Sequence, residues 1–283
     1  MNDERVVEEI VTKFLLNTCR LFTKLSRPAV QAAWSCARVV DRHPDTDVDL
    51  IPLITGSVAE FYIEPMIPHV GDIDVMFHRS TKLAIPAGHP PPIQLPAEFL
   101  GDVEVNEFVD SHLPGYVYLK LRYLLTECID DGKYNAVESN EQWYVSAVYV
   151  GQGNAHGPAV LRTCSGRLPS DAVFCIRCLV WPPQAADWPT RRRNYDWPDA
   201  ATVDRVVSNG CDVVHVAHRQ CRQDEWMNKH QWRLSFSRAE IVLINTWMPV
   251  YQIVYHLLRV FMKTERFTDS TNDSEAGKLS ISH

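Results

Sequence analysis

Two acidic residues in this sequence have a spacing that suits metal-ion chemistry. Asp72 and Asp74 lie in the stretch 72–77, where polar and apolar residues alternate as in a half-buried strand. Successive side chains of a strand point to opposite faces, so these two carboxylates project from the same face. Such hard oxygen ligands favour Mg²⁺, which completes its shell with substrate phosphates. Alone, the pair would more often be a solvated strand end or a turn.

A turn of small residues precedes the acidic pair. Gly56 lies sixteen residues before Asp72, and Gly56-Ser57 leads into the stretch 58–61, which predicts a short helix. Free backbone N–H groups at a helix start form an anion site, and glycine lets the backbone approach a phosphate closely. An ordinary turn would explain a lone glycine, but here the acidic pair follows.

The surrounding pattern predicts a mixed sheet followed by helices. An α/β region begins in the stretch 47–77, and the proline-rich stretch 85–96 predicts an irregular surface loop. After Trp181 the pattern becomes helical. Enrichment in β-branched and aromatic residues predicts further strands at Tyr116–Leu121, Trp143–Val150, Ala159–Thr163 and Ala172–Val180.

Three helices are predicted in the C-terminal part. One runs from Asp199 to Asn209 and ends at Gly210. A second starts at Ser237, where Ser237 and Glu240 fit a capping box. A third, apolar helix follows Pro249 as far as residue 263, and the polar final twenty residues favour disorder.

The N-terminal residues 4–26 predict an amphipathic helix with an apolar side and a separate basic stripe. A solvated helix face explains such a stripe, and so does a surface that contacts a nucleic-acid backbone. The stripe consists of Lys13, Arg20, Lys24 and Arg27.

Composition limits the classes of protein that this chain can be. It has 283 residues, 46% of them hydrophobic, with no apolar run long enough for a membrane span and an acidic start unlike a signal peptide. A cytoplasmic protein without a membrane partner is expected, and its eight cysteines are expected to be reduced. The formal charge of −7 means that any nucleic acid must bind a local patch.

Several segments together resemble one enzyme family. The combination covers nearly the whole chain from about residue 50 to 267, which makes it far more specific than any single motif. The family comprises cyclic GMP-AMP synthase, its animal receptor-like relatives and the male-abnormal (Mab) developmental proteins that share their fold. The segments are Gly56–Glu60, Gly71–Met76, Gly157–Val160, Ser170–Val173 and Gln231–Ser237, with support from Trp181–Gln184 and Gly210–Cys211.

This resemblance implies the roles of individual residues. Asp72, Asp74 and Asp171 would bind two Mg²⁺ ions, or Mn²⁺ in their place, while Gly56 and Ser57 would hold the triphosphate. In such a site a ribose hydroxyl attacks the α-phosphate of a nucleoside triphosphate and pyrophosphate leaves. A second round on the linear dinucleotide would give a cyclic one.

Three further residues are implied to contact nucleotides. Arg233 and Ser235 would do so from a strand, and Lys263 would face a phosphate. For Lys263 the pattern also fits a surface lysine that complements a helix dipole.

The resemblance implies an α+β fold. A nucleotidyltransferase lobe with a mixed sheet and an N-terminal spine helix, residues 1–185, would pack against a helical lobe, residues 186–283. Relatives continue past a segment resembling residues 278–280, so this helical lobe is expected to be partial or truncated.

The function implied is a nucleotidyltransferase of innate immune signalling, activated by double-stranded RNA or DNA, that makes a cyclic dinucleotide from ATP- or GTP-type substrates. The alternative is a catalytically silent interaction or scaffold protein with the same fold. The oligomeric state stays open.

Other patterns in the chain have competing interpretations. The zinc-binding insertion of the DNA-sensing synthase is missing, which leaves RNA equally open as the activator. The series Cys211, His215, His218 and Cys221 has zinc-type ligands, but ordinary packing explains it better because a predicted strand would aim the side chains apart. The stretch 175–178 predicts buried thiols rather than a redox pair, and the basic run 191–193 fits a solvated turn or a phosphate contact.

The basic stripe leads to a first prediction. Reversing Arg20 and Lys24 to Glu should weaken binding of duplex RNA or DNA, and each lost phosphate contact should flatten the plot of log affinity against log salt by about one. Binding measured over a range of salt concentrations tests this. Unchanged affinity and slope would remove the stripe from the nucleic-acid interface.

Overall fold

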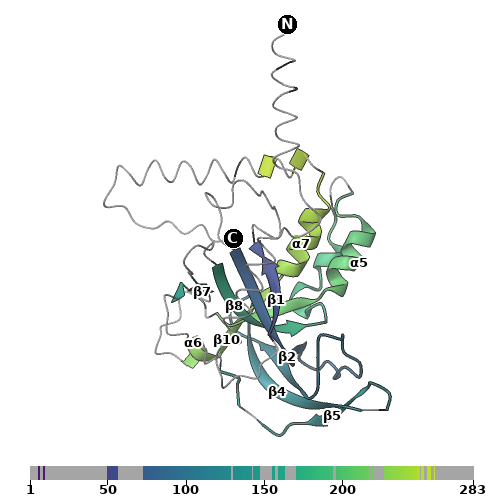
Figure 1. Cartoon of the computed structure of the whole chain (residues 1–283), viewed down its shortest axis with the longest axis vertical. Coiled ribbons are helices and arrows are strands. Elements are labelled where there is room, and N and C mark those ends of the chain that lie inside the picture. Colours follow the sequence, from purple (N-terminus) through teal and green to yellow (C-terminus); the bar gives the residue numbers. More distant parts are fainter. Residues whose placement is uncertain are drawn as a thin grey trace, which may run out of the picture. The chain divides into compact units, whose positions relative to one another are not determined.

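The computed structural model describes one sheet-based unit of the chain in detail (Figure 1). The chain divides into two compact units, and the sheet lies in the unit formed by Lys24–Glu60 and Asp72–Thr246. The predicted boundary at residue 185 stays a prediction. The residues described are 50–56, 73–128, 130–141, 143–146, 155–156, 159–162, 170–193, 196–216, 218 and 226–248, with 6, 9, 250, 251, 254, 255 and 258.

Ten strands form a single mixed sheet in this part of the chain, which agrees with the α+β class predicted. The sheet order is β1-β2-β3-β4-β10-β9-β8-β7-β6, β5 pairs with β4, and β2 also pairs with β8. The strands are β1 (Leu50–Thr55), β2 (Ile73–Pro86), β3 (Val103–Asp110), β4 (Tyr116–Glu127), β5 (Tyr134–Glu138), β6 (Ala155–His156), β7 (Ala159–Arg162), β8 (Ser170–Cys178), β9 (Cys211–Val214) and β10 (Gln231–Ser235).

The pairing of β2 with β8 closes six of these strands into a ring. Going round, β2, β3, β4, β10, β9 and β8 each pair with the next, and β8 pairs with β2 again. Of these pairings, β2 with β3 and β2 with β8 are parallel and the others are antiparallel.

All six strands contribute buried side chains to the interior of the ring. Because side chains alternate along each strand, the neighbouring residues point to the outer face. The interior residues are Ala84, Phe108, Val117, Leu119, Ile176, Cys178, Cys211, Val213, Trp232 and Leu234.

A second apolar cluster lies on the face of β2 and β3 opposite to the ring interior, because Leu83 and Ile85 alternate with the interior residue Ala84. It includes Leu83 and Ile85 of β2, Leu125 of β4, and Tyr134 of β5. Phe99, from the proline-rich loop after β2, also belongs to it. This loop starts later than predicted, because β2 continues to Pro86.

The helix α5 (Ala200–Ser208) forms as its sequence predicts. The Asp199 carboxylate accepts a hydrogen bond from the backbone N–H of Thr202 at 2.7 Å, which caps the helix. Gly210 follows at φ +61°, and a Cβ there would lie 2.2 Å from the carbonyl oxygen of Cys178. Both signals are local, which is why the sequence reveals them.

The helix α7 (Ser237–Asn245) corrects the predicted capping box. Phe236 is the N-cap, and its carbonyl accepts the first helical bond from Glu240 N–H at 2.9 Å. Ser237 therefore lies inside the first turn, where its hydroxyl contacts that of Ser235 at 3.2 Å. The helix starts at Ser237 as predicted, but Phe236 is its N-cap because β10 ends at Ser235 and leaves only Phe236 as the connection.

The helices α5 and α7 pack side by side (Figure 1). Three shorter helical segments are fully bounded within the described residues, namely α6 (Trp226–His230) and the 3₁₀ turns η2 (Pro183–Ala185) and η3 (Trp188–Thr190). No helix within the described ranges has both the length and the apolar composition needed to cross a bilayer.

Some predicted strands differ from the observed ones. In the predicted strand at 143–150, the described residues 143–146 make only a single bridge, Tyr144 to Lys120. The strands β3 and β5 were not predicted. β3 reads Val-Glu-Val-Asn-Glu-Phe-Val-Asp, so the alternation that would have identified it is present.

A histidine is buried in the sheet without a hydrogen-bonded partner among the described residues. His78 is 1% exposed, and the nearest carboxylate oxygen, Oε1 of Glu98, lies 3.6 Å from its Nε2. Burial, together with the charges of Arg238 and Arg177, lowers the pKa of His78 to about 4. The ring is therefore neutral at pH 7, and its contact with Glu98 is not an ion pair.

This histidine predicts a pH dependence of stability. Between pH 6.5 and the folded-state pKa of about 4, the unfolded chain binds the proton that folded His78 refuses, so stability falls as pH falls through this window. From pH 7 to pH 5 the loss from this group should be about 2 kcal/mol.

Urea unfolding at both pH values, compared with His78→Gln, measures this contribution. The variant should lose less stability on acidification than the unaltered chain. An equal loss in both proteins would contradict the assignment.

Candidate active site

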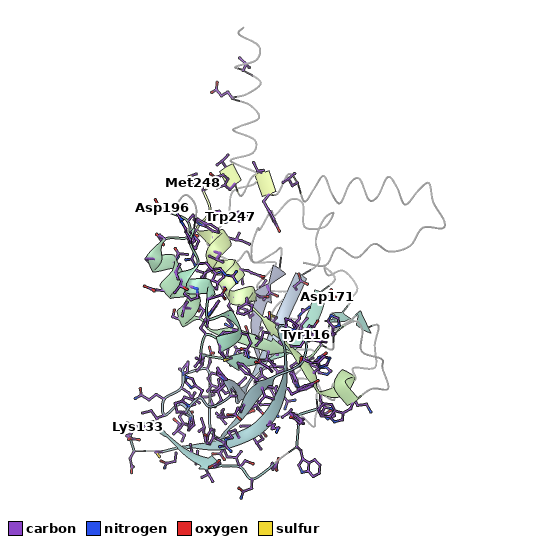
Figure 2. The ribbon with its side chains drawn as sticks, turned by 180° about the vertical axis from the view of Figure 1, so that it is seen from behind. Tyr116, Lys133, Asp171, Asp196, Trp247 and Met248 are labelled. Carbon is purple, nitrogen blue, oxygen red and sulfur yellow. The ribbon has the colours of Figure 1, made fainter. Side chains whose placement is uncertain are left out.

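Two of the predicted metal-binding acids lie side by side on neighbouring strands. Asp74 of β2 is the direct register partner of Asp171 of β8 in the parallel pairing. Register partners point to the same face, and neighbouring strands are about 4.8 Å apart, so the two carboxylates project together. Both side chains are half-buried, and Figure 2 shows Asp171 near the start of β8. The fold thus brings together two acids that are far apart in sequence.

Gly56 lies directly against this pair. It follows the end of β1, whose last residue Thr55 is the register partner of Asp74 on the other side. Gly56 has φ +63°, and a Cβ there would lie 2.0 Å from Oδ2 of Asp74. Two features therefore favour glycine here: the left-handed backbone, which side chains rarely adopt, and the Asp74 carboxylate, which occupies the place of a Cβ. The sequence predicted the glycine for a close approach to phosphate; the described contact is with Asp74.

Arg233 and Ser235 share a face with the two acids. The register runs from Asp171 along β8 to Cys175, then across to Val214 of β9 and to Arg233 of β10. By strand spacings Arg233 is roughly 15 Å from Asp171. Its side chain is exposed, whereas Ser235 is half-buried.

A buried group of charges on the same face was not found by sequence reasoning. Asp212 of β9 is 0% exposed, and Nε of Arg238 in α7 lies 2.9 Å from its Oδ2. Arg177 of β8, the register partner of Asp212, donates to the carbonyls of Cys178 at 2.7 Å and Cys211 at 2.8 Å. It also donates to the carbonyl of Asn209.

Burial and charge change the acidity of this group. Burial and the neighbouring Arg238 lower the pKa of Arg177, which as a guanidinium stays charged. Burial, reinforced by Asp212, raises the pKa of the Cys175 thiol well above its ordinary value. The thiol is thus unreactive, as predicted for stretch 175–178. Charged residues of opposite sign inside two apolar strands were the signal that could have revealed the group.

Two of the three acids predicted to bind metal ions lie within the described residues. Asp74 and Asp171 offer hard oxygen ligands on one face, which suits Mg²⁺. Within the described ranges no group of three or more metal-ligating side chains is gathered. The predicted set has Asp72 as its third member, and Asp72 lies outside those ranges.

Several other predicted residues also lie outside the described part of the chain. They are Ser57, Lys263, Lys13, Arg20, Lys24 and Arg27.

The zinc-type series after α5 is explained by packing where it is described. Cys211 belongs to the ring interior, while the rings of His215 and His218 lie against Trp232 and Tyr116, at 5.3 Å in each case. Cys221 lies outside the described residues.

The basic run 191–193 forms local contacts. Arg191 is within 2.8 Å of the Asp187 carboxylate, and Arg193 stacks on Trp188 at 4.8 Å from the ring centroid. Arg193 also donates to the carbonyl of Trp188 at 2.7 Å. These contacts favour the interpretation as a turn.

Comparison with known protein families gives one match. The model of the Mab-21 protein nucleotidyltransferase domain matches residues 152–246. The matched segment runs from the residues before β6 to the end of α7, and it contains Asp171, Arg233 and Ser235 as well as the Asp212–Arg238 pair. Gly56 and Asp74 precede it. Residues 152–246 are therefore similar to a Mab-21 nucleotidyltransferase domain, which confirms the resemblance of the sequence to the cyclic GMP-AMP synthase and Mab-21 family.

Proposed function

We propose that this chain transfers a nucleotidyl group from a nucleoside triphosphate and makes a cyclic dinucleotide. The observation that carries the proposal is the register pairing of Asp74 with Asp171, beside Gly56, in a chain with a nucleotidyltransferase domain. Two partly buried acids on one face repel each other, and a cation between them removes that repulsion. A scaffold has no need of such a pair.

The residues of the site have distinct proposed roles. Asp72, Asp74 and Asp171 would hold two Mg²⁺ ions, which lower the pKa of the attacking ribose hydroxyl and stabilise the leaving pyrophosphate. Gly56 would keep Asp74 in position, because its backbone touches the carboxylate. Gly56 and Ser57 together would also contact the triphosphate.

The nucleoside ends of the substrates would lie along the same face of the sheet. The exposed guanidinium of Arg233 can stack on a base or bind a phosphate, and the Ser235 hydroxyl adds a polar contact. Lys263 would bind a phosphate from the following segment.

The biological setting is also a proposal. A double-stranded RNA or DNA would activate the enzyme through the basic stripe of the N-terminal helix, and the cyclic product would serve as an innate immune messenger in the cytoplasm. The support is the family resemblance of the sequence and the local gathering of four basic residues in a chain of charge −7.

The acids provide the main test of catalysis. Asp74→Asn and Asp171→Asn keep the shape of each side chain and remove the charge, so the melting temperature should change little. Formation of pyrophosphate and cyclic product from ATP and GTP with Mg²⁺ and duplex RNA or DNA should fall by about two orders of magnitude or more. Asp72→Asn should behave in the same way.

Asp204→Asn is the matched control for the acids. Asp204 is exposed on α5, so its loss should leave turnover unchanged. If the unaltered chain forms no product with any nucleotide pair, metal ion or duplex, the catalytic proposal is wrong and the scaffold alternative stands. A neutral result for Asp171→Asn alone would mean that another acid completes the site.

Gly56→Ala should damage both stability and turnover. An alanine in the left-handed conformation should lower the free energy of unfolding by about 1–2 kcal/mol. Its Cβ would also displace the Asp74 carboxylate, which should lower turnover.

Gly88→Ala separates these two effects. Gly88 has φ +74°, but no described atom lies within 4 Å of the position of a Cβ. The Gly88→Ala variant should therefore lose a similar amount of stability but keep its turnover. Full turnover in Gly56→Ala would contradict the proposed contact between Gly56 and Asp74.

A further inference from the structure

Four rings from three segments form an aromatic cluster on the outer face of the sheet. The cluster consists of Tyr118 of β4, Tyr144 after β5, and Trp226 and His230 of α6. Trp226 stacks on His230 with centroids 4.4 Å apart and 15° between the planes. It also contacts Tyr144 at 5.2 Å and Tyr118 at 5.3 Å, and the two tyrosines are 5.5 Å apart. We call these four residues the aromatic platform.

Strand pairing fixes the platform. Tyr118 is the register partner of Gln231 in β10, the residue that follows α6, and Tyr144 is bridged to Lys120 of β4. Nδ1 of His230 lies 2.8 Å from the carbonyl oxygen of Trp226, which is consistent with a hydrogen bond that holds the two rings stacked. The sheet therefore holds Tyr118, while the bridge to β4 positions Tyr144 and the junction with β10 positions α6.

Packing within the platform does not cover its rings. Trp226 remains 49% exposed, although it contacts three other aromatic residues. A tryptophan that served only to anchor α6 would bury more of its surface. An indole held rigidly on three sides and half exposed is suited to stack a flat ligand.

Two lysines lie beside the platform. Nζ of Lys120 lies 4.5 Å from the centroid of Tyr144, and Lys229 is exposed on α6. The charged residues of 116–122 in β4, 226–230 in α6 and 231–235 in β10 are all basic, while Asp224 and Glu225 directly precede Trp226 in the sequence. The lysines can therefore hold an anionic ligand through local contacts, whereas the net charge of −7 of the whole chain does not attract one.

Further groups extend the surface along the sheet. Tyr116, labelled in Figure 2, lies two residues before Tyr118 on the same face of β4 and is the register partner of Arg233. The surface thus runs from Lys120 past the platform to Arg233. Aromatic rings alternating with spaced cations match a chain of bases joined by phosphates.

We propose that the aromatic platform binds single-stranded nucleic acid, with bases stacked on Trp226 and Tyr144 and phosphates held by Lys120 and Lys229. A duplex is a poorer ligand, because its bases are already stacked on one another and offer no free face. This site is distinct from the predicted N-terminal stripe for duplexes. It is also independent of nucleotidyl transfer, since the binding needs neither the acids nor a triphosphate.

Fluorescence anisotropy with labelled oligonucleotides of twelve nucleotides tests the proposal. The probes are a mixed-sequence single strand of RNA or DNA, the same strand with abasic sites in place of its central bases, and a blunt duplex. The single strand should bind at least about tenfold more tightly than the abasic strand, because each stacked base contributes a factor of this order. It should also quench tryptophan fluorescence.

Variants locate the binding on the platform. Trp226→Ala should reduce single-strand affinity about tenfold. Lys120→Gln combined with Lys229→Gln should flatten the slope of log affinity against log salt by about 1.4. Trp143→Ala is the matched control: Trp143 is 81% exposed and adjoins Tyr144, but no ring contact links it to the four platform residues within the described chain. If Trp226→Ala fails to fold, judged by its melting transition, Trp226→Phe and the lysine variants still give the answer.

Several outcomes would overturn the proposal. Equal affinity for the abasic and intact strands would show that bases do not stack on the protein. Equal losses in Trp143→Ala and Trp226→Ala would mean that any exposed tryptophan suffices. If the duplex binds more tightly than the single strand and this binding needs Trp226, the platform binds duplexes instead. If no nucleic acid binds but the protein self-associates through Trp226, the platform is a protein interface.

Discussion

The parallel pairing of β2 with β8 is the constraint on which the rest of this unit depends. The strands β2, β3, β4, β10, β9 and β8 pair in this order, and the pairing of β2 with β8 joins the first to the last. The six strands therefore surround one apolar interior. The same pairing sets Asp74 beside Asp171. A slip of one residue would turn one acid to the opposite face and open the interior packing at once. The core and the candidate site are therefore specified by a single register.

The opposite end of the candidate site is held by buried charge. Arg238 at the start of α7 pairs with the fully buried Asp212, and only three residues before Arg238 lies Ser235 at the end of β10. A buried ion pair is weak evidence for high stability, since desolvation opposes the attraction. The geometry of this pair is nevertheless specific, because Arg238 can reach Asp212 only when α7 lies in one position against β9. The pair links the position of α7 to β9, and so helps to set where β10 ends and presents Arg233 and Ser235.

Local signals made part of this structure predictable. Asp199 and Gly210 delimit α5 because a cap and a left-handed turn depend on a few adjacent residues. The start of α7 at Ser237 was predicted from a similar local pattern, but the predicted role of Ser237 as N-cap was wrong, because the end of β10 makes Phe236 the capping residue. The pairing of Asp74 with Asp171 was accessible only through resemblance, since no periodicity of one strand determines its neighbour.

Features that depend on distant partners could not be derived from the sequence. The Arg177–Asp212–Arg238 group and the aromatic platform each combine residues from separate strands and helices, and their members look ordinary one by one. Charges within apolar strands gave a usable hint for the former. Tyr118 and Trp226 gave none, because only the pairing of β4 with β10 brings them together.

Arg177 has a consequence for how this unit folds. The two Nη atoms of its guanidinium donate to carbonyls of β8, of β9 and of Asn209 at the end of α5, and each carbonyl belongs to a different part of the chain. Before all three are in place, the charge must stay in water, and the strands cannot close over it without a large desolvation cost. Partly assembled forms are thereby penalised. Docking of α5 and pairing of β8 with β9 should therefore occur in one cooperative step, because Arg177 can be buried only when both are complete.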